Sequence, residues 1–269
     1  MADIDSIDKI AIDDVDKVDA YAKASISEIN GYEVPGLLNT LYDFEDQTVN
    51  ENGAQDWNPS GTHGDWETDT AVVTGGGSWG NPASNGNTTT DGWNLGQGTT
   101  ASSGTGPGGG LDAGLDGSHS FSGKYMYVEG TGVKDDRVCV VRTPGINYST
   151  SMLSTSNDLN LKFWVHQYSF YSDGHKLYVY IDDASTSTES DATLLETTDS
   201  WAEGDNGFWR NSSGNPGHGN QASNWVQHTI SLNSYRAVDA THYIYFVADG
   251  ATTFRCDIAI DNVQFLEST

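Results

Sequence analysis

Basic residues are scarce in this chain, which carries 12 Lys and Arg against 38 Asp and Glu and has a formal net charge of −26 at pH 7. A surface of that sign repels nucleic acid and anionic membranes and attracts cations. We therefore expect no nucleic-acid partner. An acidic, Lys-poor composition fits both a calcium requirement and solubility in salty water, and the charge alone leaves both open.

Cysteine is almost absent, with Cys139 and Cys256 as the only two. Two cysteines cannot build the disulfide framework on which small secreted domains depend. A Cys139–Cys256 bridge stays open, although two unbridged, buried thiols are favoured for a chain assembled in a cytoplasm. The core must then hold by packing.

Long apolar runs are also missing, and residues 1–7 contain no basic stretch followed by an apolar one. We therefore expect neither a transmembrane helix nor an export signal. This favours a chain that is made and kept in a cytoplasm, with no membrane insertion. An extracellular type of module without export would need another way out, and cell lysis by a virus is one.

The chain does have material for a core, since 36% of its 269 residues are hydrophobic and it contains eight Trp and thirteen Tyr. Alternation of apolar and polar residues predicts regularly spaced strands. Turn residues separate them, and no convincing helix follows residue 36. This pattern predicts an all-β fold, an antiparallel β-sandwich, with strands at 41–45, 64–73, 123–129, 137–142, 159–169, 176–182, 193–197, 225–232, 242–249 and 254–266.

Residues 50–117 are rich in Gly, Ser, Thr and Asn and include the run Gly75–Gly77. Such composition predicts long loops. Four tryptophans interrupt this stretch, so we expect buried or stacked indoles to pin parts of it: Trp57, Trp66, Trp79 and Trp93.

The first 36 residues follow a different pattern, in which apolar residues recur at every third position, as in Ile4, Ile7 and Ile10. That spacing drifts around an α-helix and does not match the alternation of a strand. An extended or solenoid-like arm and a short amphipathic helix over residues 6–29 both stay open. Either is too small to bury its apolar side alone, so we expect an arm at 1–36 that docks on something else and a separate domain at 37–269.

Seven short motifs follow one another along residues 41–266: Phe44-Glu45, Gly64–Trp66, Gly104–Pro107, Gly123–Glu129, Leu161–Tyr168, Trp225–Leu232 and Ile258–Val263. In kind and order they resemble the motifs of MAM domains, the jelly-roll adhesion modules of cell-surface proteins. The resemblance implies a jelly-roll sandwich of the MAM or concanavalin-like kind, with a role in adhesion or assembly and no catalysis. Animal MAM domains use four cysteines, whereas this chain has two.

Within the arm, Ala24–Pro35 resembles the I-x-x-I-N-G-x-x-V segments that begin many virion proteins of marine tailed phages. In those proteins the repeat is thought to anchor the chain to the particle. The resemblances together favour a structural virion protein of a tailed phage: a capsid decoration, fibre or tail-associated protein. It would contact other virion proteins through residues 1–36 and form a homo-oligomer, with a trimer among the options. The alternative is a carbohydrate-binding or host-receptor-binding adhesin module.

A calcium site is expected where the first and last strands of the domain meet. Calcium takes six to eight oxygen ligands, and jelly rolls of this type often place an ion there. The matching positions are Glu45 and Asp261, with Asp65 as a third ligand from the next loop. The alternative is that these are ordinary exposed carboxylates in an acidic chain.

No enzyme site emerges. The seven histidines are scattered without zinc-ligand spacing, and no carboxylate pair stands out for glycoside hydrolysis. A Trp- and Asn-rich segment at 201–224 resembles sugar-binding surfaces, in which indoles stack on glycan rings and amides bond hydroxyls. It suggests a glycan-binding site at Trp201, Trp209, Arg210 and Asn220, with a glycan of a host surface as a candidate ligand. The alternative is a plain connection between strands that is braced by core tryptophans.

Overall fold

A computed structural model describes residues 28–29, 32–33, 39–45, 54–56, 66–68, 81–82, 93–98, 100, 106–107, 109–111, 123–128, 137–147, 158–167, 176–185, 187, 191–198, 209–210, 216–217, 225–236, 240–249 and 257–268. Its elements are β1 (Glu28–Ile29), β2 (Tyr32–Glu33), β3 (Asn39–Tyr42), β4 (Ala54–Asp56), β5 (Glu67–Thr68), β6 (Asn81–Pro82), β7 (Trp93–Gln97), β8 (Lys124–Val128), β9 (Arg137–Arg142), β10 (Ile146–Asn147), β11 (Asp158–Gln167), β12 (Lys176–Asp182), β13 (Thr193–Thr197), β14 (Trp209–Arg210), β15 (Pro216–Gly217), β16 (Val226–Ser231), the 3₁₀ turn η6 (Asn233–Tyr235), β17 (Thr241–Asp249) and β18 (Ile258–Ser268).

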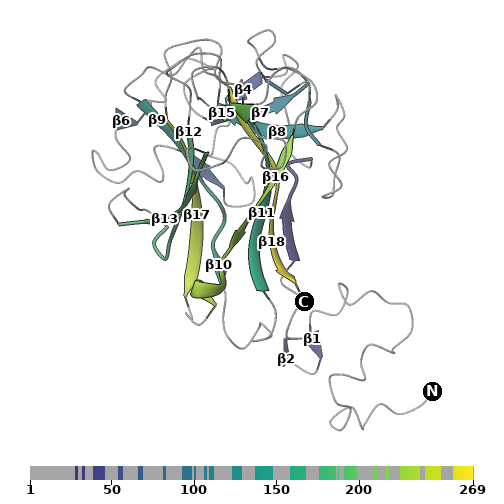
Figure 1. Ribbon diagram of the computed structural model, residues 1–269. Helices are drawn as coiled ribbons and strands as arrows, with labels where there is room; N and C mark the ends of the chain where they lie inside the picture. The colour runs from purple at the N-terminus through teal and green to yellow at the C-terminus, as the bar shows by residue number, and fades with distance from the viewer. Residues whose placement is uncertain are drawn as a thin grey trace, which may run out of the picture.

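Two sheets face each other and form a β-sandwich (Figure 1). The β12 sheet has the order β13-β12-β17-β9-β5, with β10 against β17 and β6 against β9. The β11 sheet has the order β16-β11-β18-β8-β7-β4, with β3 against β18. Successive long strands such as β16, β17 and β18 alternate between the sheets, which is jelly-roll connectivity. Pairing is antiparallel except between β6 and β9.

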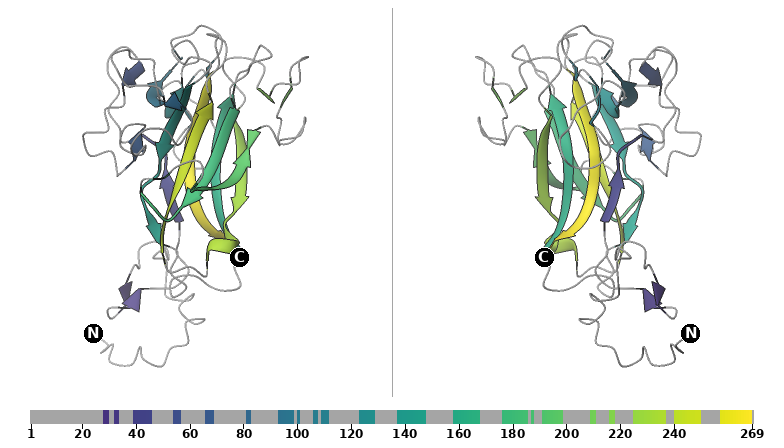
Figure 2. Two further views of the ribbon diagram at one scale, coloured as in Figure 1. Left: turned by 90° about the vertical axis from the view of Figure 1, so that its left-hand side faces the viewer. Right: turned by 90° about the vertical axis from the view of Figure 1, so that its right-hand side faces the viewer.

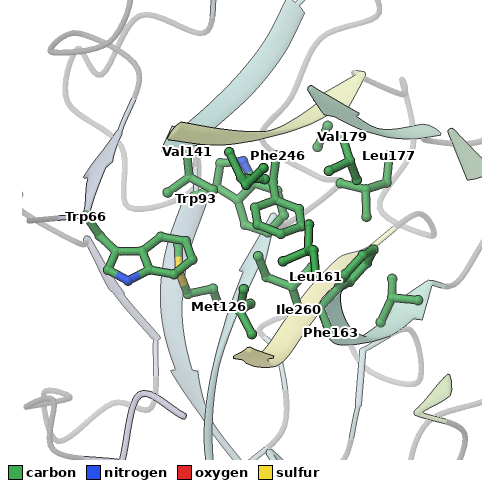
Figure 3. Close-up of a cluster of buried hydrophobic side chains, with 14 of the residues drawn as sticks. Trp66, Trp93, Met126, Val141, Leu161, Phe163, Leu177, Val179, Phe246 and Ile260 are labelled. Carbon is green, nitrogen blue, oxygen red and sulfur yellow. The ribbon is translucent and has the colours of Figure 1, made fainter. Parts of the chain in front are cut away.

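The core lies between the sheets because side chains of one parity on each strand point inward. On β11 these are Leu159, Leu161, Phe163 and Val165, all fully buried. They meet side chains of β12 and β17 from the facing sheet, including Val179 and Phe246 (Figure 3). The Phe163 and Phe246 rings pack edge to face with centroids 5.3 Å apart. Packed aromatic and branched side chains therefore supply the cohesion of the sandwich.

A β-bulge near the middle of β18 changes which residues face the core. Lys162 pairs with Gln264 but Trp164 pairs with Asp261, so β18 carries one residue more than β11 over this stretch. Asn262 adopts a φ of 44°, a conformation that Asn tolerates better than most residues. Before the bulge the even-numbered residues Ile258 and Ile260 face the core, and after it the odd-numbered residues Val263 and Phe265 do.

The expected sandwich is confirmed, and strands occupy every predicted range, though β5 covers only two residues of 64–73 and β18 starts at Ile258. Within the stretch 50–117, where long loops and a strand at 64–73 were predicted, the structure adds three strands that the prediction missed: the buried β7 and the short β4 and β6. The alternating Trp93 and Leu95 are the signal that the Gly-rich context obscured. Trp66 and Trp93 are buried as expected, while Trp57 and Trp79 lie outside the described residues.

Most of the arm also lies outside the described residues. Its described part is the hairpin of β1 and β2, in which Ile29 pairs with Tyr32. Asn30-Gly31 is the favoured two-residue hairpin connection. The helical alternative over 6–29 is therefore wrong at Glu28 and Ile29.

Cys139 is buried in β9, whereas Cys256 lies outside the described residues, so the state of the two thiols stays a prediction. In the described part of the chain, no helix is long and apolar enough to span a membrane.

Candidate functional site

Two features of the β11 sheet are candidates for function, and the first is a gap in its hydrogen-bond ladder. One edge of β18 pairs with β8 at Ile258–Ile260 and with β3 at Val263–Leu266. The two partner strands thus leave Asp261 and Asn262 between them. The chain leaving β3 and the chain entering β8 meet at this gap, as predicted for the junction of the first and last strands.

Asp261 lies in the gap and is fully buried. Its Oδ2 accepts a hydrogen bond from the Leu111 backbone N–H at 2.8 Å, and its Oδ1 accepts one from the Asn262 N–H at 2.7 Å. Burial raises the pKa of Asp261 well above its usual range, and the charges of Glu45 and Asp43 raise it further, while the two N–H donors oppose the shift. The site therefore holds a carboxyl group whose negative charge is costly.

Glu45 reaches the same gap from the end of β3. Its Oε1 accepts the Lys124 N–H at 2.9 Å, and the Lys124 ammonium donates to the Glu45 carbonyl. The Asp43 carboxylate accepts the Glu45 N–H at 3.2 Å. Glu45 and Asp43 both lie close enough to Asp261 for their charges to raise its pKa, and the sequence reasoning did not include Asp43. Asp65 lies outside the described residues.

The donor chemistry of this gap suits a hard cation, since carboxylate oxygens are the ligands that calcium prefers and mutual repulsion would be relieved by a positive charge. Among the described residues, however, no three Asp, Glu, His or Cys side chains converge as metal ligands. Glu45, Asp43 and Asp261 therefore do not form a ligand set by themselves. Asp65 or backbone carbonyls would have to complete it, and the calcium site stays a prediction.

The second feature is the outer face of the β11 sheet, part of which lies under Gly98, Thr100 and Gly109–Leu111, which we call the covering segment. Leu111 of this segment and four residues of the sheet form an outer aromatic cluster, with Trp164 packed against it: Leu111, Tyr125, Tyr127, Trp225 and Ala259. The Tyr125 hydroxyl donates to the Gly98 carbonyl at 2.9 Å, and the Trp225 indole donates to the Gly109 carbonyl at 3.1 Å. These bonds fasten the covering segment to the sheet.

Close backbone contacts add to this fastening. The Gly110 N–H donates to the Gly123 carbonyl at 2.9 Å, and a Cβ at Gly123 would lie 2.6 Å from the Gly110 oxygen. Thr100 donates to the buried carboxylate of Asp257 at 2.9 Å. Several of the motifs that resemble MAM domains therefore meet where the covering segment is held.

The remainder of the outer face carries side chains that stay partly or fully exposed, and Figure 2 (right) looks onto this side of the sheet. Alternation and register place there a set of half-exposed or exposed side chains, which we call the open face: Leu41, Asp158, Asn160, Lys162, Trp164, Gln227, Thr229, Ser231 and Leu266. Its two charged members are Lys162 and, at the start of β11, Asp158, which accepts a hydrogen bond from the Asn233 amide at 2.7 Å.

Trp164 stands at the border between the aromatic cluster and the open face. Its ring packs against the cluster yet stays half-exposed, and its buried Nε1–H has no hydrogen-bond partner among the described residues. The sequence reasoning missed it, although the alternation Leu161, Phe163, Val165 already implies that Trp164 points away from the core.

The predicted glycan residues fall partly on a hairpin near this face. Trp209 and Arg210 form β14, which pairs with β15, and β15 lies beside β11. Trp201 and Asn220 lie outside the described residues. The four are therefore not shown to share one surface.

No family model matches the chain, and no curated protein matches it. The resemblance to MAM domains and to phage virion repeats therefore stays a prediction.

Solved structures do show similarity. The K3 cleaved adhesin domain of Lys-gingipain from Porphyromonas gingivalis is 18% identical, with 84% of this chain and 97% of that one covered and a TM-score of 0.40. A cyclase from Fischerella sp. TAU is 10% identical, with 86% and 98% covered and a TM-score of 0.43. The CBM22-1 xylan-binding domain of Xyn10C from Paenibacillus barcinonensis is 9% identical, with 67% and 88% covered and a TM-score of 0.29. Function must be inferred from this chain's own residues.

Proposed function

We propose that this protein is a non-enzymatic adhesion module that binds carbohydrate on its open face. The observation that carries the proposal is Trp164, a half-exposed indole fixed against a buried aromatic cluster on the outer face of the β11 sheet. A rigid ring can stack on the apolar face of a sugar without losing much side-chain entropy.

The neighbours of Trp164 supply the polar half of such a site. Gln227 lies opposite Trp164 on β16, while Lys162 and Asn160 follow along β11. Amide and ammonium groups can bond sugar hydroxyls, which fixes the orientation of a ring that stacking alone would leave loose. Strand β15 lies beside β11, so the β14–β15 hairpin adjoins this part of the sheet.

A glycan array probed with the full chain, followed by calorimetry on the best ligand, tests the proposal. Trp164→Ala should weaken binding at least about tenfold, which corresponds to about 1.4 kcal/mol. Gln227→Ala should weaken it less, and it leaves the aromatic cluster intact. Tyr178→Ala is the matched control, because Tyr178 is a half-buried aromatic residue on the outer face of the opposite sheet. Unchanged affinity in a folded Trp164→Ala protein would contradict this location for the site.

We also propose, as a separate point, that residues 1–36 attach the domain to a virion. The support is the I-x-x-I-N-G-x-x-V resemblance together with the β1–β2 hairpin, which lies inside that motif. Deleting residues 1–36 should abolish association with purified phage particles, while the domain keeps its thermal transition. Equal association of the deleted and full chains would remove the anchoring role.

A further inference from the structure

The strand orders of the two sheets end in four edge strands, β13, β5, β16 and β4, and these are not equally protected against pairing with another strand. An edge strand exposes unpaired backbone groups, and proteins commonly shield it by shortness, a bulge or inward-pointing charge. β5 has two residues and β4 has three. β13 has five residues, but Leu195 forms a bulge between the pairs Val179–Glu196 and Tyr180–Leu194. Glu196 points inward and lies 3.5 Å from His228 of β16.

β16 lacks most of these protections. It has six residues in six consecutive pairs with β11, without a bulge. Its sequence Val-Gln-His-Thr-Ile-Ser contains neither Pro nor a carboxylate, and Val, Thr and Ile favour strands. His228 contacts Phe163 on the core side, so the outward side chains are Gln227, Thr229 and Ser231. Within the described part of the chain, no strand pairs with the edge of β16 that faces away from β11.

We propose that this edge pairs with the same edge of a second copy of the chain, antiparallel about a two-fold axis at Thr229. That register opposes Thr229 to itself and Gln227 to Ser231, and Thr–Thr and amide–hydroxyl pairs are favourable across strands. It keeps each outward residue opposite an outward residue, so the open faces of the two copies become one surface.

Charge favours this edge as the meeting point of two identical chains. Each copy carries a net charge of −26, which opposes association generally. β16 itself has no acid, Lys162 lies on the strand beside it, and the nearby Glu196 points inward against His228, so little like charge would be brought together where the two copies meet. The interface is small, and we expect a weak dimer that strengthens as salt screens the remaining repulsion.

The dimer would place two Trp164 side chains on one continuous surface. Three strand spacings separate the two β11 strands, and the register offsets the residues by four positions, so the two indoles would lie about 20 Å apart. Two sites on one face allow a repetitive surface ligand to be held at both, which raises avidity without new contacts.

Sedimentation over a range of protein and salt concentrations tests the pairing. Wild-type protein should form a dimer that Thr229→Lys weakens at least about tenfold, because like charges would meet at the axis. Thr193→Lys is the matched control: the same exposed change on the bulged edge strand β13, expected to leave the dimer unchanged.

Oxidation of Thr229→Cys should also yield a covalent dimer with a 229–229 linkage, since directly opposed strand residues have the Cα spacing of a disulfide. Mass spectrometry identifies the linkage, and Thr193→Cys should not produce a crosslink. A wild-type protein that stays monomeric under all these conditions overturns the proposal. So does a dimer that is equally weakened by both Lys variants, or one in which Thr229→Cys gives no 229–229 linkage.

Discussion

Replacing Trp225 with Phe should release the covering segment from the β11 sheet. The Trp225 indole donates to the buried Gly109 carbonyl at 3.1 Å and packs edge to face on Tyr125, with ring centroids 5.8 Å apart. Losing the donor leaves that carbonyl unsatisfied, which costs about 1–3 kcal/mol. The smaller ring leaves a cavity worth about 1 kcal/mol more.

The expected loss in the free energy of unfolding is therefore about 2–4 kcal/mol. For a chain of this size, about 2 °C per kcal/mol gives a fall in Tm of about 4–8 °C. Trp93→Phe is a matched control, because the Trp93 indole donates to the buried Cys139 carbonyl, also at 3.1 Å, but lies in the core between the sheets. Both variants should lose comparable global stability in thermal or urea unfolding.

Amide hydrogen exchange separates the two. The Gly110 N–H bonds the Gly123 carbonyl and the Leu111 N–H bonds Asp261, so both amides report on the covering segment. Trp225→Phe should speed their exchange by more than the global loss explains, since this region opens locally. Trp93→Phe should not. Identical local exchange in the two variants would refute the idea that Trp225 holds the segment down.

Two further predictions concern the gap in the ladder. The pKa of Asp261 is raised in the folded state, so between about pH 4 and that raised pKa the folded chain binds a proton that the unfolded chain has lost. With a chelator present, the contribution of Asp261 to stability should therefore be greatest below about pH 4. It should be lost as pH rises through the raised pKa. Asp261→Asn should flatten that slope in urea unfolding measured against pH; an unchanged slope would assign it to other groups. If the gap binds calcium, adding the ion should raise Tm with saturation. Glu45→Gln should reduce the gain, whereas Asp191→Asn, an exposed acid on another loop, should keep it.

The sequence by itself determined the fold class and most of the strand positions, because inward and outward side chains alternate over segments such as Leu159–Val165 and Leu177–Ile181. That periodicity is local and can be read without knowing the partner strand. The meeting of Glu45 with Asp261 was also predictable, but only through a resemblance. Loop composition concealed β7, since glycines around a short strand lower its apparent propensity although burial in the sheet compensates for it.

Only the tertiary structure decided what lies where β3, β8 and β18 meet. Asp43 joins Asp261 there because β8 and β3 pair with successive parts of β18, an arrangement set by long-range pairing. The bulge at Asn262 likewise decides which side chains face outward beyond it. The open face and the unprotected β16 edge have the same origin. A residue's exposure and a strand's edge position depend on which strands lie beside it, and chain segments far apart in sequence determine this.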